Sequence, residues 1–117
     1  MNFEKFTIKA QEAIQKAQEL SLTHGQQAIE PAHLLKGILL IDEHTVPYIL
    51  NKHGADVNLI KRTLDKIIES YPRVSNGTPY ASNDLNKVLQ KAMALLPEFK
   101  DDFIALEHLF LGILNGN

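Results

Sequence analysis

The chain has 117 residues, enough for one domain with a single core, and 44% of them are hydrophobic. Its 12 basic and 14 acidic residues give a net charge of −2 and are mixed along the chain, which argues against binding to nucleic acid or to an anionic membrane. Cysteine is absent, which excludes disulfides, thiolate zinc sites and a cysteine nucleophile. We expect a soluble cytoplasmic protein, and the lack of cysteine is consistent with a reducing compartment.

The first two predicted helices follow from apolar residues at helical spacing. Thr7 is a plausible N-cap, and the periodic pattern after it predicts a helix from about Thr7 to Thr23 that stops near Gly25. Pro31 stands at a first-turn position and opens a second helix that ends near Asp42.

Two further helices are predicted before a change in composition. Thr45 is expected to cap a short third helix that Gly54 terminates, and Asp56 is expected to cap a fourth helix with an apolar face. No segment alternates with period two for long enough to predict a strand. The pattern predicts an all-α protein with helices of modest length.

A linker and two more helices follow. Residues 71–81 are rich in Pro, Gly, Ser and Asn and are interpreted as a linker. Ser82 is expected to cap a fifth helix, and a sixth is expected from about residue 106 to 114. Pro97 should end or kink the fifth helix early, because proline lacks the amide donor and clashes with the preceding turn.

An internal repeat appears when the chain is shifted by 75 residues, because two blocks then align without a gap. The matches gather at cap and apolar positions, so we interpret the chain as a duplication. The first copy continues through two more helices, whereas the second stops after about two, which suggests a piece of a longer protein. Matched positions are Thr7 with Ser82, Gln15-Lys16-Ala17 with Gln90-Lys91-Ala92, Leu20 with Leu95, Ile29 with Ile104, His33-Leu34 with His108-Leu109, and Gly37-Ile38-Leu39 with Gly112-Ile113-Leu114.

These motifs resemble the amino-terminal domain of the Clp (Hsp100) ATP-dependent unfoldases. The resemblance covers nearly the whole chain, and within the family the chain is most similar to the ClpB disaggregases. It implies an all-α, pseudo-twofold duplicated four-helix motif with the second repeat truncated after about two helices. The implied divisions of this single domain, 1–117, are repeat one at about 6–70, a linker at about 71–81 and a partial repeat two at about 82–117. The motifs that carry the resemblance are Phe6 to Ala13, Ile29 to Leu35 and Gly37 to Leu39.

The resemblance implies a substrate-engaging, non-catalytic domain of an ATP-driven disaggregase. It would hold unfolded or aggregated polypeptide and pass it to an AAA+ ATPase ring, which is hexameric in the parent protein. The chain has no Gly-x-x-x-x-Gly-Lys-[Ser/Thr] motif, so we expect no cofactor here and ATP only in the parent. The alternative is a domain that docks an adaptor protein, as in ClpA and ClpC relatives.

Family resemblance also points to substrate-binding positions. Polar residues related to substrate correspond to Thr7, Asp101 and Glu107, although Thr7 is also explained as a cap and Asp101 as part of a solvated loop. The apolar groove of ClpB domains corresponds to three further residues, of which the leucine could equally be core. These three are Lys91, Leu95 and His108.

Five histidines raise the question of a metal site. Glu30-x-x-His33 resembles the Glu-x-x-His motif of di-iron helix bundles. The second repeat has Ala105 at the position of Glu30, so the duplication does not preserve such a site. We therefore expect His33 and His108 to serve structure or to line a groove, and we expect no metal.

Overall fold

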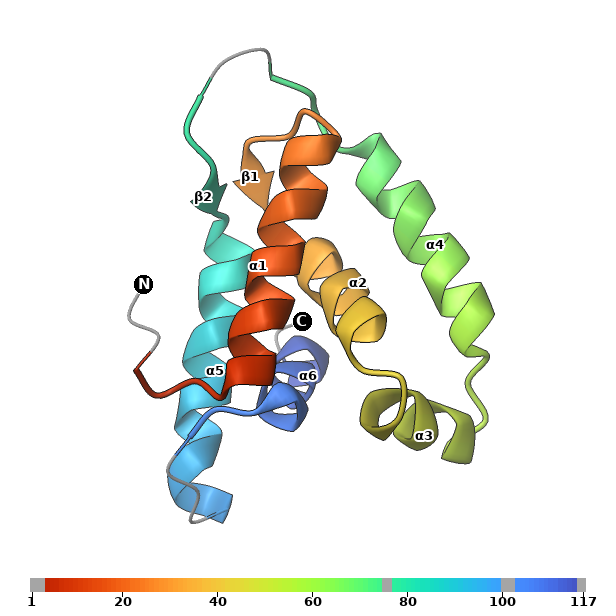
Figure 1. Cartoon of the computed structure of the whole chain (residues 1–117), viewed down its shortest axis with the longest axis vertical. Helices are drawn as coiled ribbons and strands as arrows, with labels where there is room; N and C mark the ends of the chain where they lie inside the picture. The colour runs from red at the N-terminus through yellow and green to blue at the C-terminus, as the bar shows by residue number, and fades with distance from the viewer. Residues whose placement is uncertain (1–3, 75–76, 100–102, 116–117) are drawn as a thin grey trace.

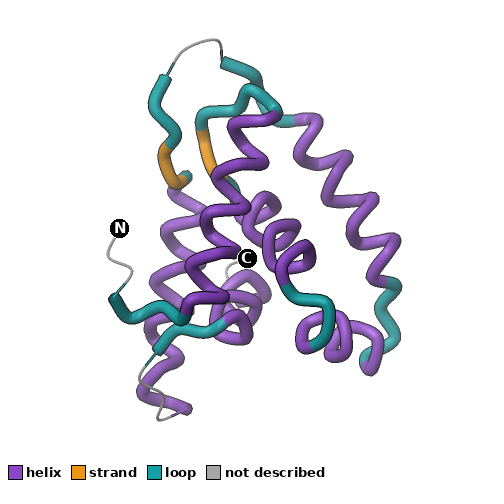
Figure 2. The backbone as a smooth tube through the Cα atoms, in the orientation of Figure 1, coloured by secondary structure: helices purple, strands orange, loops and turns teal. Residues whose placement is uncertain are grey.

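The computed structural model describes residues 4–74, 77–99 and 103–115 and is mainly helical, as the sequence predicts (Figure 1). Figure 2 shows that helices make up most of the path of the chain, with two very short strands between them. No helix in these ranges is both long and apolar enough to cross a membrane. The helices are α1 (Ile8–Thr23), α2 (Pro31–Ile41), α3 (Thr45–Lys52), α4 (Val57–Ser70), α5 (Asn83–Phe99) and α6 (Leu106–Asn115), and the strands are β1 (Ala28–Ile29) and β2 (Tyr80–Ala81).

Hydroxyl side chains start the first helix of each repeat, as predicted. Thr7 Oγ1 accepts a hydrogen bond from the amide of Ala10 (3.2 Å) at the start of α1. Its counterpart Ser82 Oγ accepts one from the amide of Leu85 (3.0 Å) at the start of α5. Such caps satisfy amides that have no partner inside the helix, so the two equivalent helices begin in the same way.

Carboxylates start α3 and α4. Asp56 accepts hydrogen bonds from two amides in the first turn of α4, as predicted. The prediction that Thr45 caps α3 is wrong, because Thr45 is the first residue of that helix. The N-cap residue is His44, and the amides are satisfied by the Asp42 carboxylate, which accepts hydrogen bonds from those of His44 (3.0 Å), Thr45 (3.0 Å) and Val46 (2.8 Å). A charged acceptor binds these amides more strongly than a hydroxyl group can.

A glycine brings the two helices of each hairpin close together. A Cβ atom placed on Gly37 in α2 would lie 2.7 Å from the carbonyl oxygen of Ala13 in α1. A Cβ on Gly112 in α6 would lie 2.7 Å from the carbonyl oxygen of Val88 in α5. Ala13 and Val88 are themselves related by the repeat, so both hairpins pack by the same close approach.

Two short parallel pairings join the repeats crosswise, and the sequence did not predict them. Ile29 in β1 pairs with Ala81 in β2, and Ile104 pairs with Phe6. The residue that follows each partner donates its amide to the carbonyl of Ile29 (3.0 Å) or of Ile104 (2.9 Å). Because Ile104 is the repeat counterpart of Ile29, and Ala81 that of Phe6, each pairing is the pseudo-twofold image of the other.

A single hydrophobic core takes side chains from both repeats. Its apolar members come mainly from the inner faces of α1, α2, α5 and α6, which lie around the centre of the molecule (Figure 1). The fully buried large side chains include Leu34, Ile38, Val46, Val88, Ile104 and Leu109. The repeats therefore fold as one unit around a shared core.

The repeats differ in how their second helix is covered. α4 packs on α2, where Lys36 and Asp65 form an ion pair of 2.9 Å. The described part of the second repeat contains counterparts of α1 and α2 only. Accordingly, Leu39 in α2 is 2% exposed, whereas its counterpart Leu114 in α6 is 58% exposed.

Pro97 does not shorten α5, so the prediction of an early end is wrong. The helix continues past Pro97 to Phe99. A proline inside a helix removes one amide hydrogen bond and crowds the preceding turn. Pro97 lies in the last turn, and α5 forms in spite of this cost.

Candidate functional site

Thr7, the first of the predicted site residues, is held by hydrogen bonds within the protein. Its hydroxyl caps α1, and its amide donates to the carbonyl of Ile104 (2.9 Å). The second bond places Thr7 beside the segment that leads into α6, although the two are far apart in sequence. Thr7 is half-buried, so its hydroxyl reaches solvent only in part.

Lys91 and Leu95 lie one turn apart on α5, on the side that faces α6. Val88 and Ala92 belong to the same helical stripe, and their backbone atoms lie against Gly112 of α6. Lys91 is exposed and Leu95 is half-buried. This edge of α5 therefore places a cation next to an apolar side chain.

His108 lies in the first turn of α6 and is buried. Its Nδ1 accepts a hydrogen bond from the amide of Ala105 (2.8 Å), so the ring satisfies an amide at the start of the helix. Glu107, next to it in the sequence, is exposed. Asp101 lies outside the described residues. Of the predicted set, Lys91 and Glu107 are thus the charged side chains that the structure places at the surface.

His33, the counterpart of His108, lies in a buried hydrogen-bond network. Its Nδ1 accepts from the amide of Glu30 (2.9 Å), and its Nε2 lies 2.7 Å from Oε1 of Gln26. The Nε2 atom therefore carries the proton, since Nδ1 acts as an acceptor. The Gln26 amide group donates in turn to the carbonyl of Ile68 at the end of α4 (2.5 Å).

The same hydrogen-bond network indicates a structural role for His33 in the Glu30-x-x-His33 motif. Both ring nitrogens of His33 are engaged by protein groups, and the ring is fully buried. Burial, with the charge of His24 as a smaller cause, lowers the pKa of His33 to about 4. In the ranges that the structure describes, no three His, Asp or Glu side chains gather in a way that could hold a metal ion. His33 therefore ties α2 to α4 as a neutral ring.

The helices α1 and α5 lie side by side where the two repeats meet (Figure 1). A recess of about 200 Å³ is lined by residues of both helices and of the two strands. Buried aliphatic side chains form its floor, and the more exposed Gln18 and Tyr80 stand at its rim. None of the predicted site residues lines it. We name it the α1–α5 recess, and its lining residues are Ile14, Ala17, Gln18, Ile29, Leu34, Pro79, Tyr80, Ala81, Leu85 and Leu89. An apolar hollow of this kind can bury an apolar group of a ligand.

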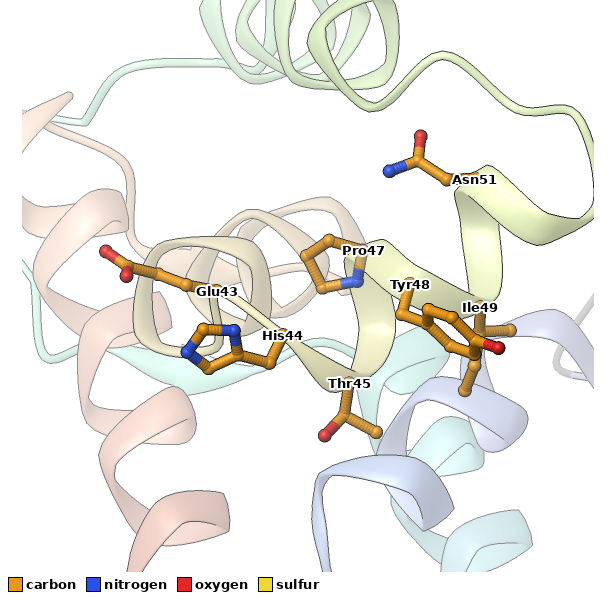
Figure 3. A pocket seen from close by; sticks show the side chains of 7 residues that line it. All are labelled: Glu43, His44, Thr45, Pro47, Tyr48, Ile49 and Asn51. Atoms are coloured by element: carbon orange, nitrogen blue, oxygen red, sulfur yellow. The ribbon is translucent and has the colours of Figure 1, made fainter.

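A wider and shallower hollow of about 640 Å³ lies along α3. Figure 3 shows its side chains spread along the outside of the helix instead of converging on one point. Tyr48 is 63% exposed, and the ammonium group of Lys52 lies 5.9 Å from the centre of its ring. We name this face the α3 surface, and its residues are Glu43, His44, Thr45, Pro47, Tyr48, Ile49 and Asn51.

The sequence model of the protein family described as Clp repeat (R) N-terminal domain matches residues 5–117, which is nearly the whole chain. This chain belongs to the Clp N-terminal domain family. The helical, duplicated fold described above is the fold that the resemblance implied. The conclusion rests on the sequence match and on the structure together.

Bacterial ClpB chaperones are similar to this Clp N-terminal domain over almost its full length. The chaperone protein ClpB of Bacteroides thetaiotaomicron is 47% identical over 114 residues, and that of Porphyromonas gingivalis is 46% identical over 114 residues. Each alignment covers 97% of this chain and 13% of the relative. The chain thus spans about an eighth of the length of these relatives, at the level of one N-terminal domain.

Solved structures of Hsp100 N-terminal domains share the fold. The N-terminal domain of Hsp104 from Candida albicans superposes with a TM-score of 0.87 at 21% identity, covering 97% of this chain and 75% of that one. The N-terminal domain of ClpV1 from Escherichia coli superposes with a TM-score of 0.87 at 23% identity, covering 98% and 70%. At these identities the likeness concerns the fold alone.

Sequence reasoning missed the α1–α5 recess as a candidate site. The residues on its floor carry ordinary core spacing, so nothing in their own pattern separates them from other core positions. One signal was present in the repeat alignment, because Ala81 stands at the position of Phe6. A change from a large to a small side chain at a buried position can leave a hollow.

Proposed function

We propose that this domain binds unfolded or aggregated polypeptide for a ClpB-like ATP-dependent disaggregase. The carrying observation is the apolar α1–α5 recess on a domain that is 47% identical to the N-terminal part of a ClpB chaperone. An unfolded chain exposes apolar side chains that a native client buries. A small apolar hollow can therefore select for unfolded segments without reading a sequence.

Binding of this kind would be weak. The recess of about 200 Å³ accommodates only one large side chain, and a single buried side chain contributes about 1.5–3 kcal/mol. Weak binding suits a domain that must release its client to the next component. The proposal includes transfer of the client to a hexameric AAA+ ring of the parent protein, which would bind ATP and act in the cytoplasm.

The predicted site residues remain part of the proposal as a second contact area. Lys91, Leu95 and Glu107 reach the surface of α5 and α6, and Asp101 belongs to the segment between those helices. Thr7 and His108 would act by holding the start of α1 and of α6 in place. An extended client could contact both this edge and the recess.

The function is tested by titrating the chain with a permanently unfolded model protein, such as reduced and carboxymethylated α-lactalbumin, while amide NMR shifts are recorded. We expect fast-exchange shifts at millimolar client, confined to the recess or to the edge formed by Leu95 and Glu107. The same protein in its native, disulfide-bonded state is the control and should cause no shifts. Equal shifts with both forms, or none with either, would overturn the proposal.

Adaptor docking is the second candidate, and the α3 surface favours it. An exposed tyrosine on a broad, shallow face is typical of contacts between folded proteins, where aromatic residues are enriched. A pulldown with the chain should then return one stoichiometric folded partner that Tyr48→Ala no longer retains. A spread of misfolded proteins, unaffected by Tyr48→Ala, would instead favour client binding.

A further inference from the structure

The pseudo-twofold arrangement relates the strand pairing at Phe6 to the strand pairing at Ala81, but these two ends of the core are not equivalent. At one end, Phe6 pairs with Ile104 and is 6% exposed. At the other end, Ala81 pairs with Ile29 and lines the α1–α5 recess. Since Phe6 and Ala81 are counterparts in the repeat, the second end lacks a phenyl ring that the first end contains.

The surroundings of the two positions are equivalent as well. Each aliphatic residue that lines the recess along the helices and β1 has a repeat counterpart 75 positions away. These counterparts belong to the same buried core as Phe6. Both sets contribute to one buried core, and the set at the Ala81 end also lines the recess. The corresponding pairs are Ile14 with Leu89, Leu89 with Ile14, Ala17 with Ala92, Ile29 with Ile104, Leu34 with Leu109, and Leu85 with Ala10.

One substitution compensates in part. Leu85 stands where the Phe6 end has Ala10, so the Ala81 end gains a leucine while it loses a phenylalanine. A leucine side chain is smaller than that of phenylalanine, so the compensation is incomplete, and a recess of about 200 Å³ lies at this end. Apolar cavities of about 150 Å³ bind benzene, so this space is sufficient for one aromatic ring.

We infer that the α1–α5 recess is a socket for one aromatic side chain of a bound polypeptide, which occupies the place that Phe6 fills at the related end. Tyr80 stands at the rim, 53% exposed, where its ring can pack against the incoming ring. Ala81 is the residue that determines this specificity, because its small side chain leaves the space open. A client ring reaches the socket only if the chain binds unfolded polypeptide, so this inference rests on the proposed function.

The test uses two short peptides of Gly, Ser and Asn that differ only in a central Phe or Ala. We expect the Phe peptide to shift the amide resonances of Ile14, Leu34 and Leu89 and the Ala peptide to leave them unchanged. Ala81→Phe fills the socket with the protein's own ring and should weaken binding of the Phe peptide about tenfold or more. Ala81→Leu fills it in part and should have an intermediate effect.

Ala94→Phe is the matched control, because Ala94 is exposed on α5, a helix that borders the recess, and the substitution adds the same ring outside the recess. It should leave binding of the Phe peptide within about twofold of the wild type. Thermal unfolding of each variant shows whether it is folded, and filling the hollow should make Ala81→Phe at least as stable as the wild type. Undiminished binding of the Phe peptide to folded Ala81→Phe would overturn the inference.

The unfolded model protein separates this inference from the proposed function. If it binds wild type and Ala81→Phe equally and shifts no residue of the recess, the proposed function stands and the aromatic socket is wrong. If it does not bind the wild type at all, the proposed function fails first. Weaker binding of the unfolded protein to Ala81→Phe, with Ala94→Phe unaffected, supports both.

Discussion

At the residue scale, equivalent positions in the two repeats have taken different roles around a common scaffold. His33 and His108 each accept an amide hydrogen bond at the start of a helix, through Nδ1 in both cases. The His33 ring is also linked through Gln26 to the end of α4. This link makes the stability of the first repeat depend on a neutral imidazole.

Acidification should therefore destabilise the chain through His33. Its pKa is lowered to about 4 by burial, against an ordinary value of 6.5, so between these pH values the unfolded chain binds a proton that the folded chain does not. The stabilisation is complete above pH 6.5 and is lost as the pH falls towards 4, by about 3 kcal/mol in total. Urea unfolding at several pH values between 7 and 4 measures this slope.

His33→Asn supplies the comparison, because Asn can accept the amide of Glu30 but does not titrate. Its free energy of unfolding should be lower than that of the wild type at pH 7 and should vary less with pH between 6.5 and 4. His44→Asn replaces an exposed histidine and should keep the wild-type slope. An unchanged slope in His33→Asn would show that another group is responsible.

At the scale of elements, the helical hairpins depend on close backbone contact. Gly37 and Gly112 each face a backbone carbonyl at a distance that leaves no room for a Cβ atom. In an exposed helix, replacing Gly by Ala usually stabilises by about 1 kcal/mol. At these two positions the hairpin must open before an alanine fits.

We expect Gly37→Ala and Gly112→Ala each to lower the free energy of unfolding by about 1–3 kcal/mol, since overpacking outweighs the gain in helix propensity. Urea unfolding monitored by far-UV circular dichroism gives the values. Gln15→Ala, an exposed substitution on α1, should change stability by less than about 0.5 kcal/mol. A stabilised glycine variant would mean that the helices separate more easily than the contact distances imply.

At the scale of the whole molecule, the duplication is symmetric in the core and asymmetric at the periphery. The crosswise strand pairs and the two hairpins follow the pseudo-twofold arrangement. α3 and α4, which belong to the first repeat, lie on the side of the molecule away from α5, as Figure 1 shows. Matched positions on α2 and α6 therefore experience different environments, as Leu39 and Leu114 do.

Truncating these two leucines should reveal the asymmetry. Leu39→Ala removes a buried side chain and should cost about 2–5 kcal/mol, whereas Leu114→Ala in this chain should cost less than about 0.5 kcal/mol. Thermal unfolding of the two variants side by side measures the difference. Equal losses would indicate that Leu114 is covered in solution, for example by a second copy of the chain.

Local chemistry explains what could be predicted from sequence. The apolar spacing, the caps at Thr7, Asp56 and Ser82, and the 75-residue repeat each depend on residues close in sequence or on direct comparison of segments, and each appears in the structure. Two predictions at helix ends were wrong. Thr45 is the first residue of α3, whose first amides donate to the Asp42 carboxylate, and α5 continues past Pro97.

The sequence by itself determined the helical class, the duplication and the family, because periodicity and capping are encoded within each segment. Only the tertiary structure decided the pairing of Ile29 with Ala81 and of Phe6 with Ile104, since strands of two residues carry no pattern. It alone also decided that a recess lies beside Ala81, between α1 and α5. Whether a hollow remains depends on how completely side chains that are distant in sequence fill a shared volume. That filling is determined only when the two repeats pack together.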